Sequence, residues 1–186
     1  MYRVPFTLAY YGGMRLSEIE RLTWKHHQCR QERLYFAGAK TGEWRYVPLL
    51  GGTVKLLASL PRGRDNDLMF PGFDDRSARA HAWRKAAAAV GLGAWHCRKC
   101  DAEVFDRECP EHGHLVVKDI KYHGPLFRFT RTTAIRTLTN RGVPTARVMQ
   151  MMGHKTFSVH MGYNVEEEAD LDLIREKYDC NQNVTR

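Results

Sequence analysis

A chain of 186 residues has room for one good-sized domain that buries its own core, so no disulfide framework is needed to hold it together. Lys and Arg number 29 against 21 Asp and Glu, and the resulting net charge of +8 favours a polyanionic partner, nucleic acid first, over a neutral small molecule. No apolar run approaches the roughly 20 residues of a membrane span, and no signal-peptide pattern opens the sequence, so we expect a cytoplasmic protein.

The first fifty residues predict a broken helix followed by a β-hairpin. Gly12 and Gly13 interrupt the segment VPFTLAYYGGMRLSEIERLTW, and because glycine commonly ends a helix, we expect a short helix on each side. The segment RLYFAGAKTGEWRYVPL has two runs rich in Tyr, Phe, Val and Trp around a turn-forming cluster, which is typical of a β-hairpin. Lys40 lies at the predicted tip of this hairpin.

Two helices and an irregular stretch follow the hairpin. The segment GGTVKLLASL predicts a short helix ended by Pro61. The segment DDRSARAHAWRKAAAAVG predicts a longer helix that is capped by Asp74 or Asp75 and closed by Gly91. Residues 94–124 carry cysteines, histidines and mixed charges without a sustained period, so we expect an inserted loop or a miniature subdomain there.

The last third of the chain is predicted to be helical again. One helix is expected at about residues 128–141, and a second begins at Pro144, a residue that favours the first turn of a helix. Tyr163 is then expected on a short exposed helix. A charged terminal helix over roughly residues 166–178 precedes a polar tail.

Two arginines stand where the predicted helices should be apolar. Arg15 shares a helix face with Ile19, and Arg131 lies one turn before Ile135. Each arginine can simply reach solvent or pair with a carboxylate such as Glu18. Alternatively, guanidinium groups that converge from separate helices form a clamp for one phosphate, because their planar donor pairs match phosphate oxygens.

A third candidate for anion binding is the junction around His154. The segment Gly153-His154-Lys155-Thr156 is predicted to end one helix and open the next, which places donors beside exposed backbone N–H groups. Tyr163 follows nine residues after His154, and a tyrosine in such a place is commonly a packing residue.

Together these segments resemble the catalytic domain of tyrosine recombinases of the phage-integrase type. YYGGMRLSEIERLTW resembles the first arginine motif of the family, AKTGEWRYVPL its lysine-bearing hairpin, and RTTAIRTLTNRGVPTARVMQMMGHKTFSVHMGYN its second-arginine, histidine and tyrosine block. The motifs occur in the family's order and spacing. The resemblance implies an α+β fold that is mainly α-helical, with a small β-hairpin or sheet. The zinc-knuckle-like insertion that we also expect is not part of the family pattern.

The resemblance also implies roles for individual residues. In the family these positions cleave and rejoin DNA through a 3′-phosphotyrosine without a catalytic cofactor. The implied roles are phosphate binding for Arg15 and Arg131, general acid for Lys40, assistance for His154, nucleophile for Tyr163 and orientation of the first arginine for Glu18. The implied partner is double-stranded DNA, bound by a tetramer on paired sites, with nucleoid-associated localisation and no membrane.

One position departs from the family pattern. Arg128 stands where the family usually has a histidine, three residues before the second arginine. Histidine can exchange a proton near neutral pH, whereas arginine can only bind charge. Water, His160 or His123 would then have to accept the tyrosine proton. Two rival functions follow: a cleavage-deficient DNA-binding relative, and an enzyme like type IB topoisomerases.

The resemblance divides the chain as follows. Residues 1–178 are expected to form the catalytic domain, with residues 94–124 as an insertion and residues 179–186 as a flexible tail. Family members usually carry a core-binding domain before this region, and we expect it to be absent here. A C-terminal segment of the family commonly docks on a neighbouring subunit, a role open to residues 166–178.

The insertion predicts a zinc site by its own spacing. Cys97 and Cys100 form a CxxC pair, and Cys109 with His112 forms a CxxH pair, with His114 as an alternative fourth ligand. Such a short polar segment has too few apolar residues for a core, so a bound structural zinc would supply its stability. The alternative is a flexible loop whose cysteines are reduced and bind no metal.

Overall fold

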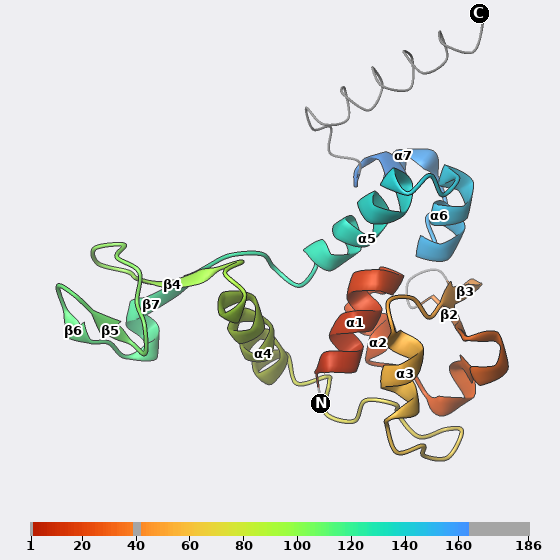
Figure 1. Cartoon of the computed structure of the whole chain (residues 1–186), viewed down its shortest axis with the longest axis horizontal. Coiled ribbons are helices and arrows are strands. Elements are labelled where there is room, and N and C mark those ends of the chain that lie inside the picture. The colour runs from red at the N-terminus through yellow and green to blue at the C-terminus, as the bar shows by residue number, and fades with distance from the viewer. Residues whose placement is uncertain (1, 39–41, 164–186) are drawn as a thin grey trace, which may run out of the picture.

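The computed structural model describes residues 2–38 and 42–163, which form a helical body and a projecting arm (Figure 1). The N-terminal part of the body contains two helices, a small sheet and a third helix. Their bounds are α1 (Arg3–Gly12), α2 (Leu16–Ile19), β1 (His27–Gln28), β2 (Arg33–Ala37), β3 (Trp44–Pro48) and α3 (Thr53–Ala58), with 3-10 turns at Trp24–His26 and Cys29–Gln31.

The sheet of the body is antiparallel, in the order β1-β2-β3. In its register Leu34 faces Val47 and Phe36 faces Arg45, and all four side chains are buried. The strands alternate between buried and more exposed residues because successive side chains point to opposite faces of a sheet. An arginine therefore occupies an inward position otherwise taken by apolar residues.

The C-terminal part of the body packs on this first part. It consists of α5 (Phe129–Asn140), α6 (Thr145–Met152) and α7 (Phe157–Met161). Helix α5 packs along α1, and α6 lies against α5 and β3. Gly13, with φ +58°, allows this close approach, since a Cβ there would lie 2.4 Å from the sulfur of Met152. The junction of α1 and α2 thus touches the end of α6.

The arm extends from the end of α4 (Arg76–Ala89), away from the rest of the body (Figure 1). Asp75 caps α4 by accepting hydrogen bonds from the backbone N–H groups of Ser77 and Ala78. The arm comprises the antiparallel pair β4 (Ala94–Cys97) and β7 (Ile120–His123), the short pair β5 (Glu108–Cys109) and β6 (Gly113–His114), and a 3-10 turn at Val117–Asp119.

Most predicted elements are present, with two differences near the candidate site. Arg15 does not lie on a helix: its backbone is extended, with ψ 149°, and it is the residue before the first turn of α2. Its helical alignment with Ile19 was therefore wrong, because α2 is only four residues long. Tyr163 lies in the turn after α7, where the prediction was a helix. The strand β1 was not predicted.

Several predictions fall outside the described residues. Lys40, the terminal helix over residues 166–178 and the tail over residues 179–186 are among them. Within residues 2–38 and 42–163, no helix has the length and apolar character needed to cross a membrane.

Candidate active site

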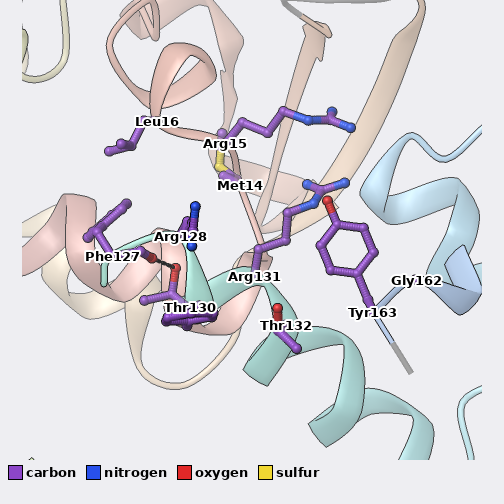
Figure 2. A pocket seen from close by; sticks show the side chains of 11 residues that line it. Met14, Arg15, Leu16, Phe127, Arg128, Thr130, Arg131, Thr132, Gly162 and Tyr163 are labelled. Carbon is purple, nitrogen blue, oxygen red and sulfur yellow. Dashed lines mark hydrogen bonds between the residues drawn. The ribbon is translucent and has the colours of Figure 1, made fainter. Parts of the chain in front are cut away.

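A cavity of about 460 Å³ lies where three parts of the body meet. Arg15 reaches it from the α1–α2 junction, Arg128 and Arg131 from the start of α5, and Tyr163 from the turn after α7. Figure 2 shows the guanidinium groups of Arg15 and Arg131 close together, with the hydroxyl of Tyr163 beside that of Arg131. The structure thus brings together four predicted site residues that are far apart in the chain.

Arg15 is held by a buried carboxylate. Glu18, whose side chain has no exposed surface, accepts hydrogen bonds from the backbone N–H of Arg15 at 2.8 Å and from its Nη1 at 3.1 Å. The Arg15 side chain keeps 26% of its surface exposed. Glu18 therefore fixes one edge of this guanidinium and leaves the rest of it available to an anion, as the role of an orienting residue requires.

The same carboxylate binds Arg45, a residue that the sequence analysis missed. The Nη1 and Nη2 of Arg45 donate to the two oxygens of Glu18 at 2.9 and 2.7 Å, a bidentate pair. Burial on its own would raise the pKa of Glu18, but Arg45 and Arg15 together lower it below its ordinary value. The alternation of strand β3, which turns position 45 inward beside Val47, was the signal that could have identified Arg45.

Arg131 is buried and held by three groups. Its Nη1 donates to the carbonyl of Gly13 at 2.6 Å, and its Nη2 donates to the carbonyl of Met152 at 2.6 Å and approaches the Nε2 of His154 at 2.8 Å. Burial, followed by the charge of Arg15, lowers the pKa of Arg131 to about 10, so it stays protonated at neutral pH. Its buried Nε has no acceptor among the described residues. A bound anion would satisfy such a donor.

His154 is buried behind Arg131 and neutral. Burial and then the charge of Arg131 lower the pKa of His154 to about 4. Gly153, with φ +66°, is required beside it, because a Cβ would lie 2.9 Å from the Nη1 of Arg45. Lys155 is exposed and pairs with Glu43 at 3.0 Å.

Tyr163 packs against His154 and Arg131, but it is not a core residue. Its ring stacks on that of His154, with centroids 5.0 Å apart and planes 17° apart, and lies 5.8 Å from the guanidinium carbon of Arg131. The side chain is half-buried, and the hydroxyl faces the cavity (Figure 2). Packing of the ring and access of the hydroxyl to a ligand are therefore combined in one residue.

Arg128 and the alternative proton acceptors lie in different places. Arg128 is exposed at the cavity rim, with its guanidinium carbon 5.2 Å from the ring of Phe129. His160 is buried beyond His154, and His123 belongs to the arm, where it stacks on His96. Neither of the two alternative histidines lines the cavity.

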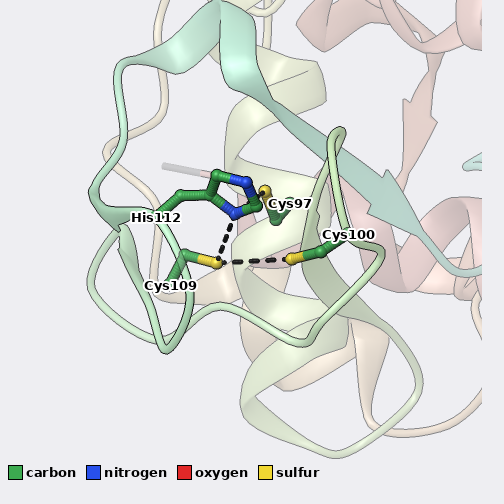
Figure 3. A group of neighbouring side chains, drawn as sticks. All are labelled: Cys97, Cys100, Cys109 and His112. Atoms are coloured by element: carbon green, nitrogen blue, oxygen red, sulfur yellow. Dashed lines mark hydrogen bonds between the residues drawn. The ribbon is translucent and has the colours of Figure 1, made fainter.

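A second group of candidate site residues lies in the arm (Figure 3). The sulfur of Cys100 lies 3.5 Å from that of Cys109, and the Nδ1 of His112 lies 3.5 Å from Cys109 and 3.8 Å from Cys97. Tetrahedral zinc with S and N ligands would space its ligand atoms about 3.5–3.8 Å apart. The four residues therefore fit a metal ion. His114 is not in this group, and its Nδ1 lies 2.8 Å from a carboxylate oxygen of Glu108.

The comparisons with known proteins agree with this architecture. The body has the fold of tyrosine recombinase catalytic domains. Residues 1–100, more than half of the chain, match the model of the Phage integrase family, and the chain belongs to that family. The match includes Arg15, whereas Arg131, His154 and Tyr163 lie beyond it.

Two solved structures show the same fold at low identity. The XerA recombinase is 16% identical with a TM-score of 0.66, over 94% of this chain and 57% of that one. The Tn1549 transposon integrase in complex with transposon right end DNA is 11% identical with a TM-score of 0.57, over 95% of this chain and 58% of that one. This chain therefore spans little more than half the length of either structure. A search of curated proteins found no match.

Proposed function

We propose that this chain is the catalytic part of a site-specific DNA recombinase, a DNA strand transferase with Tyr163 as nucleophile. The observation that carries the proposal is the convergence of Arg15, Arg131 and the Tyr163 hydroxyl on one cavity. The Tyr163 oxygen attacks a phosphodiester and forms a P–O bond, while the bond from phosphorus to the 5′ oxygen breaks. The products are a 3′-phosphotyrosine and a free 5′-hydroxyl, and the reverse attack rejoins the strand.

The arginines would stabilise the charge that develops on the phosphate. Arg15 presents its unpaired edge, and Arg131 is preorganised by its contacts with Gly13 and Met152, so neither needs to reorient during the reaction. Arg128 at the rim adds a third positive charge. In the role implied by the family, Lys40 donates a proton to the departing 5′ oxygen.

The tyrosine proton needs a different acceptor from the family's histidine. Arg128 stays protonated at neutral pH and cannot accept it. Among the described residues, neither His160 nor His123 lines the cavity, and this favours water over these two histidines as the acceptor. This substitution of water for a general base predicts slower cleavage, since general-base catalysis contributes typically about 10²–10⁴-fold.

A denaturing gel of covalent protein–DNA adducts tests the proposal. Native protein is incubated with nicked duplex DNA from its own genomic flanks, beside Tyr163→Phe, Arg128→His and the control Tyr10→Phe, an exposed tyrosine of α1. We expect an adduct with the native protein and Tyr10→Phe, no adduct with Tyr163→Phe, and a faster adduct with Arg128→His. A native adduct that survives in Tyr163→Phe would contradict the proposal.

Two outcomes would favour the rivals. An adduct seen only with Arg128→His would indicate a DNA-binding relative that has lost cleavage. Relaxation of supercoiled plasmid without a defined site would indicate chemistry of the type IB topoisomerase kind.

We also propose double-stranded DNA as the partner and a tetramer on paired sites as the active assembly. The net charge of +8 supports the first, and the Tn1549 integrase structure contains transposon DNA. Because phosphate contacts release counterions, the affinity should fall steeply between about 50 and 200 mM salt. Binding that is insensitive to salt would contradict this partner.

For the arm we propose a structural zinc ion held by Cys97, Cys100, Cys109 and His112. The support is the tetrahedral spacing of their ligand atoms. A zinc with four protein ligands has no open position for a substrate, so its contribution there is to hold the arm together.

A further inference from the structure

Two buried histidines lie in series behind Arg131. The Nε2 of His154 is 2.8 Å from the Nη2 of Arg131, and the Nδ1 of His154 is 3.3 Å from the Nδ1 of His160. His160 is only 3% exposed and belongs to α7, the helix that precedes Tyr163. Both ring nitrogens of His154 are therefore in contact with another side chain of the protein.

Only one arrangement of protons satisfies both contacts. A guanidinium has donors and no acceptor, so the Nε2 of His154 must be the unprotonated nitrogen that accepts from Arg131. A neutral His154 then carries its proton on Nδ1 and donates it to His160. The Nδ1 of His160 accepts this proton, and the proton of a neutral His160 is on its Nε2.

We propose that His160 is a positioning residue that fixes His154 as the Nδ1–H tautomer, so that His154 accepts from Arg131 and holds that guanidinium in the cavity. The catalytic consequence rests on the proposed function. Both nitrogens of His154 are engaged inside the free protein, so in this arrangement His154 acts on the site through Arg131.

His160 is also linked to the nucleophile. Its backbone carbonyl accepts a hydrogen bond from the backbone N–H of Tyr163 at 3.0 Å, and the Tyr163 ring stacks on His154. His160 thus contacts both His154, which holds Arg131, and the turn that carries Tyr163. A shift of His160 would move both reacting groups relative to each other.

Two substitutions of His160 separate the hydrogen bond from packing. Phe in His160→Phe fills the space of the ring but offers no acceptor, whereas Asn in His160→Asn loses the ring but places an oxygen close to the Nδ1 position. Val159→Ala, an exposed change on the same helix, is the matched control. The tautomer of His154 is read from the ¹⁵N shifts of its ring in free protein at pH 7, with His154→Asn to assign the signals.

The expected spectrum shows His154 unprotonated at Nε2 in the native protein, Val159→Ala and His160→Asn, and a mixture of tautomers in His160→Phe. Adduct formation should slow about 10-fold in His160→Phe and recover in His160→Asn, by analogy with the loss of a hydrogen-bond partner behind a metal-binding histidine. A native His154 protonated at Nε2, or an unchanged tautomer in His160→Phe, would overturn the inference. The spectra need no DNA, so they decide it even if the native protein forms no adduct.

Discussion

The body and the arm of this protein are held together by different means. The body buries an extended apolar core from α1, the sheet and α3, and it also buries the ion pair of Glu18 with Arg45. The arm buries four hydrophobic residues, and two of them are Cys97 and Cys109 of the proposed metal site. A polar active site can be preorganised inside a large core, whereas a short segment needs another source of stability.

Charge separates the two regions as well. The arm, residues 94–124, contains five basic and six acidic side chains, so the excess of positive charge belongs to the rest of the chain. The active-site arginines all lie in the body. DNA binding by charge is therefore expected of the body, and the arm is better suited to bracing than to extending a DNA-binding surface.

Removal of the proposed zinc ion should have the largest effect and should unfold the arm alone. Structural zinc contributes about 10–16 kcal/mol in comparable peptides, and the arm has little else to order it. We expect chelation or Cys109→Ser to remove the hydrogen-exchange protection of residues 94–124 while α1 and α5 keep theirs. Cys29→Ser, a change at an exposed cysteine, is the control and should alter neither region. If the arm kept its hydrogen-exchange protection without metal, the arm and the body would not differ in how they are stabilised.

Glu18→Gln should have the next largest effect and should act on the body. The change leaves Arg45, whose side chain is 5% exposed, as a buried charge without its carboxylate. We expect the free energy of unfolding, measured with urea, to fall by about 3–5 kcal/mol. Glu20→Gln is the matched control. Glu20 is 25% exposed and its partner Arg79 keeps a hydrogen bond to the carbonyl of Phe73, so about 1 kcal/mol or less is expected. Equal costs for the two variants would refute the role of Glu18.

A smaller effect is expected from pH, again in the body. The folded pKa of His154, about 4, lies below the unfolded value of 6.5, so the unfolded chain binds a proton that the folded protein rejects. This group stabilises the fold fully above pH 6.5, and its contribution is lost as the pH falls toward 4, with a slope of at most about 1.4 kcal/mol per pH unit. The pKa of Glu18 is also lowered, so its contribution to stability is likewise lost as the pH falls below the ordinary pKa of a glutamate.

Unfolding of native protein and of His154→Asn between pH 7.5 and 4.5 measures this slope. The variant should lose stability less steeply with acid, because it lacks one of the protons that drive unfolding. Parallel curves for the two proteins would show that His154 is not held neutral by the fold.

The smallest effect is expected from His114→Ala in the arm. His114 and its partner Glu108 are both more than 60% exposed, and such surface pairs contribute little, so stability should change by about 0.5 kcal/mol or less. Zinc content should be unchanged, whereas His112→Ala should lower it. Loss of zinc in His114→Ala, measured by elemental analysis, would reassign the fourth ligand.

Much of the fold could be predicted because its signals are local. Glycines mark the ends of the helices α1, α4 and α6, and the Asp75 cap begins α4. The hairpin follows from its two β-forming runs. The site was less predictable: Arg15 was expected on a helix, yet its position depends on a four-residue helix and a contact with Glu18. Arg45 went unnoticed because the alternation of the strand indicates only that position 45 faces inward, whereas its partner Glu18 is brought to it by the tertiary structure.

The sequence by itself determined the elements, the family resemblance and the set of Cys and His residues that share the arm, because each depends on spacing within a short stretch of chain. Only the tertiary structure decided which groups hold the reacting side chains. Arg131 meets a carbonyl 118 residues away, and Glu18 meets Arg45 27 residues away, so their partners are set by how α1, α5, α6 and β3 pack. The short distances from His112 to Cys97 and Cys109, and from His154 to Arg131, likewise depend on the tertiary structure, because no spacing in the sequence specifies them.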